Sequence, residues 1–329
     1  MSNHIGKTKP NIWEKPGPLF IQAPMEDVTD SVFRQVILRC GAPDIFFTEF
    51  TNVEGLRSVG RDKVAHRLQF TPSEQPLIAQ LWGDKPENYY AIAQELSAQG
   101  FAGIDINMGC PVRKKVRRGA CSGLINFPDH ASEIIKATQE GSGGLPVSVK
   151  TRCGVSHWVT EEWIGHLLKH QLAAITVHGR IAKEMSHFPA HWDEIALAVQ
   201  LRNHLSPATK IIGNGDVSSY QDGLDKIQQF GVDGVMIGRG IFKNPWIFDP
   251  KIDPEHKTIE ERMDLLIYHV ELFDQTWGTS KNFHLLKKFF KIYVHGLPNA
   301  GELRDQLVRV ENIQQALELA RTIKATHAS

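Results

Sequence analysis

The sequence predicts a (β/α)8 barrel followed by a small all-α domain. Eight short apolar runs recur along the first 250 residues, and most are separated by amphipathic stretches of helical length. The cores of these runs are continuous rather than alternating, which is typical of parallel strands buried on both faces. Eight such strands alternating with helices over roughly 240 residues indicate a barrel.

The strands and helices are expected at defined positions. The strand runs are 18–25, 43–50, 76–83, 102–109, 146–152, 173–180, 210–216 and 232–240, and clear helical patterns include 87–99, 129–140, 160–170 and 219–230. Helix-start signals stand at Pro128-Asp129 and at Ser218. The alternative fold is an open doubly wound sheet. That fold would need a glycine-rich turn after the first strand, and PLFIQAPMEDV lacks the G-x-G-x-x-G pattern.

The pattern changes after residue 250. A proline-containing linker, DPKIDPEHK, precedes helical patterns at 258–279, 283–295 and 311–325, and no strand signal accompanies them. We therefore expect an N-terminal tail over 1–16, a catalytic barrel over 17–250 and a helical domain over 251–329.

Composition excludes several classes of protein. Lys and Arg together number 37, as do Asp and Glu, so any surface for nucleic acid must be a local patch. The four cysteines (Cys40, Cys110, Cys121 and Cys153) are too few for a disulfide scaffold and form no C-x-x-C pair, so we expect free thiols and no metal site. No apolar run of membrane-spanning length and no signal peptide are evident. The sequence thus predicts a cytoplasmic protein without an obligate protein partner.

Polar groups follow nearly every expected strand. They are Pro24-Met25, Glu49, Gln80, Asn107 with Cys110, Lys150 with Arg152, His178, Asn214-Gly215-Asp216 and Gly238-Arg239-Gly240. The active site of a barrel of this kind lies at the carboxyl ends of its strands. One such residue alone would be an ordinary solvated group, but eight together predict a single functional site.

The loops after the last two strands predict a phosphate site. Glycines at 213, 215, 238 and 240 let backbone N–H groups approach a phosphate, and Arg239 adds positive charge. Lys150 and His178 end neighbouring strands, where a cation suits an anionic ring such as reduced flavin. Lys150 could instead form a Schiff base, and Gln80 could pair with a flavin edge or simply bond to a loop.

Seven segments in this order resemble the tRNA-dihydrouridine synthases. They are APMEDVTD (23–30), QLWG (80–83), DINMGCP (105–111), VKTRCG (149–154), VHGR (177–180), GNGD (213–216) and IGRGIFKNPW (237–246). The resemblance covers roughly residues 17 to 310. It implies an FMN-dependent barrel with a helical C-terminal domain that binds RNA, with NADPH as reductant and folded tRNA as substrate.

The resemblance also assigns roles to matching positions. The implied flavin contacts are the backbone of Ala23, Pro24 and Met25, the side chains of Gln80, Lys150 and His178, and a phosphate site at Asn214, Gly215, Asp216, Gly238 and Arg239. Cys110 matches the catalytic cysteine, and Asn107 and Arg152 match residues near the target uracil. Cys121 and Cys153 depart from the family pattern without blocking the chemistry.

The implied chemistry is a conjugate reduction of the uracil C5–C6 double bond. A hydride reaches C6, and C5 then needs a proton from the opposite face. A thiol has an unperturbed pKa of about 8.5, so we expect Cys110 to be mostly protonated at neutral pH and to donate that proton. Asn107 and Arg152 are expected to hold the uracil carbonyls.

Two basic segments are candidates for RNA contact. One is the run at 113–118, and the other contains Lys287 and Lys291 at i, i+4 spacing in the expected helix 283–295. We expect the neighbouring Phe289, Phe290 and Tyr293 to pack rather than to stack on bases. Two rival functions are a flavin barrel acting on a free pyrimidine, which needs no helical extension, and a non-catalytic RNA-binding protein, which needs no flavin residues.

Overall fold

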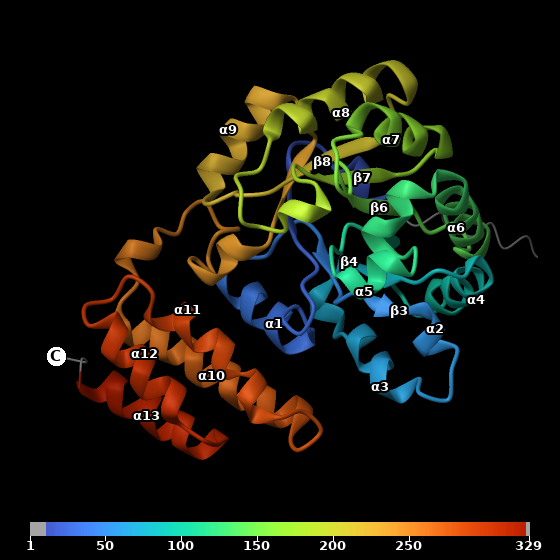
Figure 1. The fold of residues 1–329 in the computed structure, drawn as a ribbon. Coiled ribbons are helices and arrows are strands. Elements are labelled where there is room, and N and C mark those ends of the chain that lie inside the picture. The colour runs from blue at the N-terminus through green and yellow to red at the C-terminus, as the bar shows by residue number, and fades with distance from the viewer. Residues whose placement is uncertain (1–10, 327–329) are drawn as a thin grey trace, which may run out of the picture.

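The parallel sheet forms the centre of the molecule (Figure 1). The computed structural model describes residues 11–326. Its strands are β1 (Leu19–Gln22), β2 (Phe46–Phe47), β3 (Thr51–Asn52), β4 (Leu77–Trp82), β5 (Gly103–Met108), β6 (Val147–Arg152), β7 (Ala174–His178), β8 (Lys210–Asn214) and β9 (Gly234–Ile237). Each lies within or just after a predicted run. The second run, 43–50, contains β2, and β3 follows it.

Strand order confirms the predicted barrel. The strands pair in parallel in the order β1-β9-β8-β7-β6-β5-β4-β2, and β3 also pairs with β4. Backbone hydrogen bonds close the ring between its two ends, from Gln22 N–H to the Ile45 carbonyl at 3.1 Å and from Asp44 N–H to the Phe20 carbonyl at 2.8 Å. The carboxyl ends of all strands therefore meet at one rim.

Helices surround the barrel and continue beyond it. Those that follow the strands are α1 (Ser31–Cys40), α2 (Val53–Leu56), α3 (Asp62–Ala65), α4 (Pro86–Ser97), α5 (Arg113–Arg117), α6 (Pro128–Gly141), α7 (Thr160–Leu167), α8 (Trp192–Leu205) and α9 (Tyr220–Phe230). The C-terminal helices are α10 (Ile259–Trp277), α11 (Phe290–Val294), α12 (Ala300–Arg309) and α13 (Ile313–Thr326). Among the described residues, none of these helices has the length and apolar character needed to cross a membrane.

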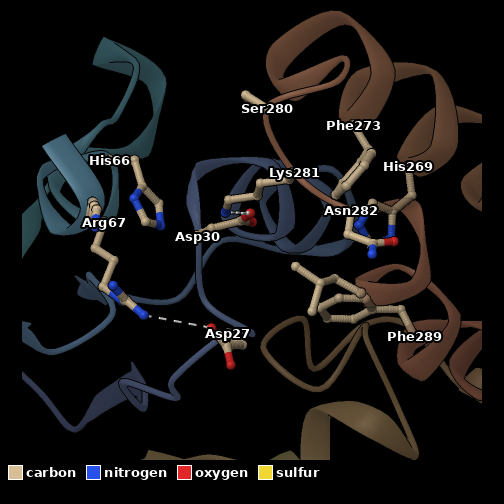
Figure 2. Close-up of a pocket in the computed structure, with 12 residues that line it drawn as sticks. Asp27, Asp30, His66, Arg67, His269, Phe273, Ser280, Lys281, Asn282 and Phe289 are labelled. Atoms are coloured by element: carbon tan, nitrogen blue, oxygen red, sulfur yellow. Dashed lines mark hydrogen bonds and ion pairs between the residues drawn. The ribbon is translucent and has the colours of Figure 1, made fainter.

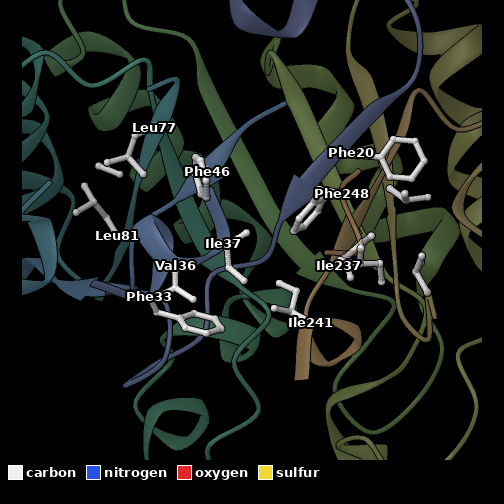
Figure 3. Close-up of a cluster of buried hydrophobic side chains, with 14 of the residues drawn as sticks. Phe20, Phe33, Val36, Ile37, Phe46, Leu77, Leu81, Ile237, Ile241 and Phe248 are labelled. Carbon is white, nitrogen blue, oxygen red and sulfur yellow. The ribbon is translucent and has the colours of Figure 1, made fainter. Parts of the chain in front are cut away.

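Two hydrophobic clusters hold the barrel together. The larger one fills the space between the sheet and the outer helices, where α1 packs Phe33, Val36 and Ile37 against the strands (Figure 3). The smaller one lies within the barrel and contains Ile21 and Met236. Trp13, on a short 3-10 helix (Ile12–Glu14), belongs to this inner cluster and is 1% exposed. Part of the predicted tail is thus a component of the barrel core.

The expected helix 283–295 is not continuous. Two 3-10 turns (Phe283–Leu285 and Lys287–Phe289) precede the short helix α11. Apolar side chains at positions 286, 289, 290, 292, 293 and 294 are all buried. They require burial on more faces than one amphipathic helix offers, so packing overrides the local helical pattern. The burial of Phe289, Phe290 and Tyr293 confirms their predicted packing role.

Asp30 joins the barrel to the C-terminal helices. Its Oδ1 accepts a hydrogen bond from the Phe33 N–H and so caps α1, while its Oδ2 accepts from Trp277 Nε1 at 3.0 Å and Lys281 Nζ at 2.8 Å. The ion pairs Asp30–Lys281 and Asp27–Arg67 line a junction cavity of about 260 Å³ (Figure 2). The predicted domain boundary at residues 250 and 251 stays a prediction.

We predict that Trp13→Ala lowers the free energy of unfolding by about 3–5 kcal/mol, because it empties a large volume in the inner cluster. Thermal or denaturant unfolding measures the change. Glu14→Ala, on the exposed side of the same turn, is the matched control and should change stability by less than about 0.5 kcal/mol. Equal stability of the two variants would contradict a core role for Trp13.

Candidate active site

A cavity of about 530 Å³ opens at the carboxyl ends of β1, β6, β7, β8 and β9. Ten of the eleven residues predicted to bind the cofactor line it, namely Ala23, Pro24, Met25, Lys150, His178, Asn214, Gly215, Asp216, Gly238 and Arg239. Arg180 and Lys243 line it as well. The cavity wall therefore carries four cationic side chains, Lys150, Arg180, Arg239 and Lys243, against the single carboxylate of Asp216.

Lys150 is held in the cavity by Asn214. Its Nζ donates to Asn214 Oδ1 at 2.8 Å, and Asn214 Nδ2 donates in turn to the Met236 carbonyl at 2.7 Å. Burial, together with the nearby Arg152, lowers the pKa of Lys150 to about 8. The amine is therefore mainly charged at neutral pH, and it is fixed in position by an amide that is itself fixed to the backbone.

His178 is neutral. Burial and the surrounding charges of Arg152, Lys150 and Arg180 hold its pKa well below the usual range. Arg180 Nη1 lies 2.9 Å from His178 Nε2, and a guanidinium can only donate. His178 Nε2 is therefore the acceptor, and the ring proton resides on Nδ1, where it is available as a donor.

The loops after β8 and β9 are organised by Asp216. Its carboxylate accepts hydrogen bonds from Arg239 Nη2 at 2.9 Å, from Arg180 Nη2 and from the Ala190 N–H at 2.9 Å. Burial alone would raise the pKa of Asp216, but these donors outweigh burial and lower it. A Cβ on Gly215 would lie 2.6 Å from the Ala190 Cβ, and the φ of Gly215 is +129°, so this position requires glycine.

Gln80 does not line the cavity. It is fully buried in the barrel, where its Nε2 donates to Asp105 Oδ2 at 2.7 Å and its Oε1 accepts from Asn107 Nδ2 at 2.9 Å. Ser148 Oγ donates to the other Asp105 oxygen at 2.6 Å. Burial raises the pKa of Asp105 to about 6. Sequence reasoning assigned no role to Asp105, although its carboxylate orients the Gln80 amide.

Asn107 and Arg152 both hold the loop that carries Cys110. Asn107 Oδ1 accepts from the N–H groups of Gly109 at 3.1 Å and Cys110 at 2.9 Å. Arg152 Nε donates to the Gly109 carbonyl at 2.9 Å. Burial and the charge of Arg180 lower the pKa of Arg152 to about 10, so the guanidinium stays charged at neutral pH. The structure thus shows both predicted substrate residues supporting the thiol loop.

Comparison with known proteins identifies the family. The family model described as "Dihydrouridine synthase (Dus)" matches residues 21–328. This chain belongs to the dihydrouridine synthase family. A "Probable tRNA-dihydrouridine synthase" of Staphylococcus aureus (strain MRSA252) is 46% identical over 317 residues, covering 94% of this chain and 95% of that protein. A "Probable tRNA-dihydrouridine synthase 2" of Bacillus subtilis (strain 168) is 45% identical over 315 residues, with the same coverage of 94% and 95%.

Solved structures show a weaker likeness. Morphinone reductase in complex with tetrahydroNAD is 13% identical with a TM-score of 0.47, and the match covers 73% of this chain and 95% of that chain. The assignment of this dihydrouridine synthase family member to the barrel fold rests on its own strand order.

The two predicted RNA lysines make different contacts in this family member. Lys287 Nζ donates to the Val308 carbonyl at 2.8 Å, near the end of α12, whereas Lys291 Nζ lies 4.8 Å from the ring centre of Phe242. In the other basic segment, Arg118 pairs with Asp84. Arg113, Lys114 and Arg117 are exposed on α5, close in sequence to Cys110.

Sequence reasoning missed Arg180 as a site residue, although it stands two positions after His178 in VHGR. It is 1% exposed and connects His178, Asp216 and the Phe188 carbonyl. Within residues 11–326, no group of three or more His, Cys, Asp or Glu side chains is arranged to hold a metal ion.

Cys110 differs from the expectation of an ordinary, mostly protonated thiol. A hydrogen bond from the Cys121 thiol is the main reason that the pKa of Cys110 is lowered to about 6. The Val112 N–H and the charge of Lys115 also lower this pKa, whereas burial opposes the shift. The same bond and burial raise the pKa of Cys121 well above its usual range. Of the two thiols, Cys110 is therefore the one that loses its proton more readily. Sequence spacing alone did not reveal the donor, which lies eleven residues away.

We predict that iodoacetamide alkylates Cys110 in the folded protein with a midpoint well below that of an ordinary thiol, because the other three cysteines are buried and only Cys110 is partly exposed. Cys121→Ala removes the hydrogen-bond donor, so the midpoint should rise. Cys121→Ser retains a donor and should keep the midpoint low. Alkylation rates measured against pH by mass spectrometry test this, and identical midpoints in all three proteins would contradict it.

Proposed function

We propose that this protein is an FMN-dependent enzyme that reduces the C5–C6 double bond of specific uridines in tRNA to 5,6-dihydrouridine, with NADPH as reductant. The observation that carries the proposal is that a cation-lined cavity and the Cys110 loop share one rim of the barrel, linked through β6 by Lys150 and Arg152. Family membership supports tRNA as the substrate, which in turn supports a cytoplasmic location.

The cavity residues fit FMN. Its volume of about 530 Å³ lies within the range of about 300–1,000 Å³ typical of ligand sites. Arg239 and the glycines at 215 and 238 would hold the phosphate, and Asp216 would orient Arg239 rather than touch the phosphate. Lys150 and the backbone of Ala23–Met25 would hold the ring. When bound, the flavin supplies the hydride for C6 of the uracil.

The side chains of the protein would supply the remaining chemistry. Cys110, once protonated, would donate to C5, and a pKa near the working pH suits a general acid. Arg152 uses its Nε and Nη1 groups on the carbonyls of Gly109, Ile181 and Met185. Its Nη2 group donates to no side chain or carbonyl among the described residues, and we assign it to a uracil carbonyl. Asn107 would act mainly by positioning Cys110.

The rival functions are less well supported. A Schiff-base enzyme would use Lys150 as a nucleophile, whereas here the amine is mainly protonated and bonded to Asn214. A non-catalytic RNA-binding protein needs neither the cationic cavity nor a partly exposed thiol beside it. Purified protein that binds no flavin would remove the catalytic proposal. Equal activity on free uridine and on tRNA transcript would favour an enzyme for free pyrimidines.

We predict that Cys110→Ala lowers dihydrouridine formation on tRNA by at least about 100-fold, because it removes the general acid. FMN content, measured by absorbance, should remain that of the wild type, since Cys110 does not line the cavity. Cys121→Ser is the matched control and should stay active. Undiminished product in the Cys110→Ala protein would exclude the acid role.

We predict that Lys287→Glu with Lys291→Glu weakens tRNA binding, and that Arg113→Glu with Lys114→Glu does so as well. Each lost phosphate contact should reduce the slope of log K against log salt by about 0.7–0.9. Fluorescence anisotropy at several salt concentrations measures this slope. Lys136→Glu, an exposed position on α6, is the control. If charge reversal at one of these two pairs of residues changes neither the tRNA affinity nor its salt dependence, that pair does not contact RNA.

A further inference from the structure

Three large apolar side chains are exposed on the loops that join β6 to α7 and β7 to α8. Phe188 is 57% exposed, Met185 43% and Trp158 37%. We call these three residues the aromatic platform. Exposed groups of this kind mark interaction sites more often when they gather in one place. The two loops are tied together by hydrogen bonds from the N–H groups of Ala182 and Lys183 to the carbonyls of Gly154 and Val155, both at 2.9 Å.

The platform is attached directly to the candidate active site. Arg152, which holds the Cys110 loop through Gly109, also donates from Nη1 to the carbonyls of Ile181 at 3.1 Å and Met185 at 3.0 Å. Arg180 Nε donates to the Phe188 carbonyl at 2.7 Å. Ser186, between Met185 and Phe188, lines the cavity. The two arginines thus hold the backbone of Met185 and Phe188 beside the cavity and the Cys110 loop.

Backbone strain supports a functional placement of Met185. Its φ of +55° and ψ of −103° are unfavourable for a residue with a side chain. The conformation is maintained by the Met185 N–H, which donates to the Ala182 carbonyl at 3.1 Å, and by Arg152 on the Met185 carbonyl. A strained conformation persists where the surrounding structure maintains it. Here Arg152, a predicted substrate residue, is one of the groups that maintain it.

Polar groups that can contact RNA lie next to the platform. The same two loops expose one lysine and three histidines, namely Lys183, His157, His187 and His191. The one acidic side chain in the second loop, Glu184, is turned inward, where its Oε2 accepts from the Ile181 N–H at 3.0 Å and its Oε1 lies 3.9 Å from His191 Nε2. Trp158 also packs edge-on against His191, with ring centres 4.8 Å apart. The helices that follow these loops, α7 and α8, carry the acidic residues Glu161, Glu162 and Asp193 in their first turns. The match to single-stranded RNA therefore rests on the apolar faces, which suit base stacking, and on Lys183 as a phosphate contact.

We propose that the aromatic platform stacks a nucleobase that flanks the target uridine in the RNA. The inference rests on the proposed function. Taking the target base out of its stack leaves its neighbours without a partner on one side, and aromatic faces restore that contact. The platform therefore lowers the cost of extruding the uridine and contributes to the choice of site.

The test uses FMN-loaded protein and a tRNA transcript whose modified uridine has been mapped with the wild type. Phe188→Ala and Trp158→Ala should each weaken tRNA binding about 10-fold, the scale of one lost stacking contact. Phe188→Tyr should bind like the wild type. Tyr90→Ala removes an exposed aromatic from α4 and is the control that should not change affinity. NADPH-dependent reduction of the flavin should be unaffected in every variant.

Transcripts with an abasic nucleotide on either side of the target identify the stacked base. The wild type should bind one of these abasic transcripts more weakly than the intact tRNA. Phe188→Ala should bind that abasic transcript no more weakly than it binds intact tRNA, because the stacking contact is already lost. Wild-type affinity in both alanine variants would overturn the proposal and leave a protein-binding surface as the interpretation of the exposed side chains. Wild-type protein that neither binds nor modifies tRNA would instead overturn the proposed function, and this inference with it.

Discussion

Closure of the parallel sheet by backbone hydrogen bonds is the constraint on which the other features depend. The bonds between β1 and the segment before β2, made by Gln22 and Asp44, complete the ring. Closure brings the carboxyl ends of all strands to one rim, so residues far apart in sequence, such as Met25 and Arg239, line one cavity. Trp13 and the inner apolar cluster fill the other end of the barrel. The barrel thus has one packed end and one polar end.

Positively charged groups lie close together at the polar end of the barrel. Their burial and mutual repulsion are unfavourable, and hydrogen bonds to nearby acceptors offset this cost. Lys150, Arg152, His178 and Arg180 lie close enough that burial and mutual repulsion lower the pKa values of the first three. Each group has a defined acceptor: Asn214 for Lys150, backbone carbonyls for Arg152, and Asp216 and His178 for Arg180. The cluster therefore stays charged, apart from the neutral His178, and its order suits an anionic ligand. Arg152 and Arg180 also donate hydrogen bonds to backbone carbonyls of the Cys110 loop and of the loop after β7, so both loops are fixed to the cluster.

Much of the fold followed from local sequence pattern, because continuous apolar runs and amphipathic helices have different periods. The predicted runs contain β1, β2 and β4 to β9, and ten of eleven cofactor positions reached one cavity because strand ends in a barrel converge. The contacts that local pattern did not anticipate have a common cause. Gln80 is bonded inward to Asp105, the helix expected at 283–295 is divided by packing, and Lys287 bonds to a carbonyl of α12. Each of these outcomes depends on a neighbour that local pattern does not identify.

The sequence by itself determined the order of strands and helices, the residues at the strand ends and the likeness to one enzyme family, because these depend on local spacing and residue type. Only the tertiary structure decided the state of the groups at those positions. The low pKa of Cys110 depends on Cys121, the tautomer of His178 on Arg180, and the position of the Phe188 backbone on Arg180, which donates to its carbonyl. Protonation and exposure are set by contacts across the fold, and such contacts exist only once the barrel has closed.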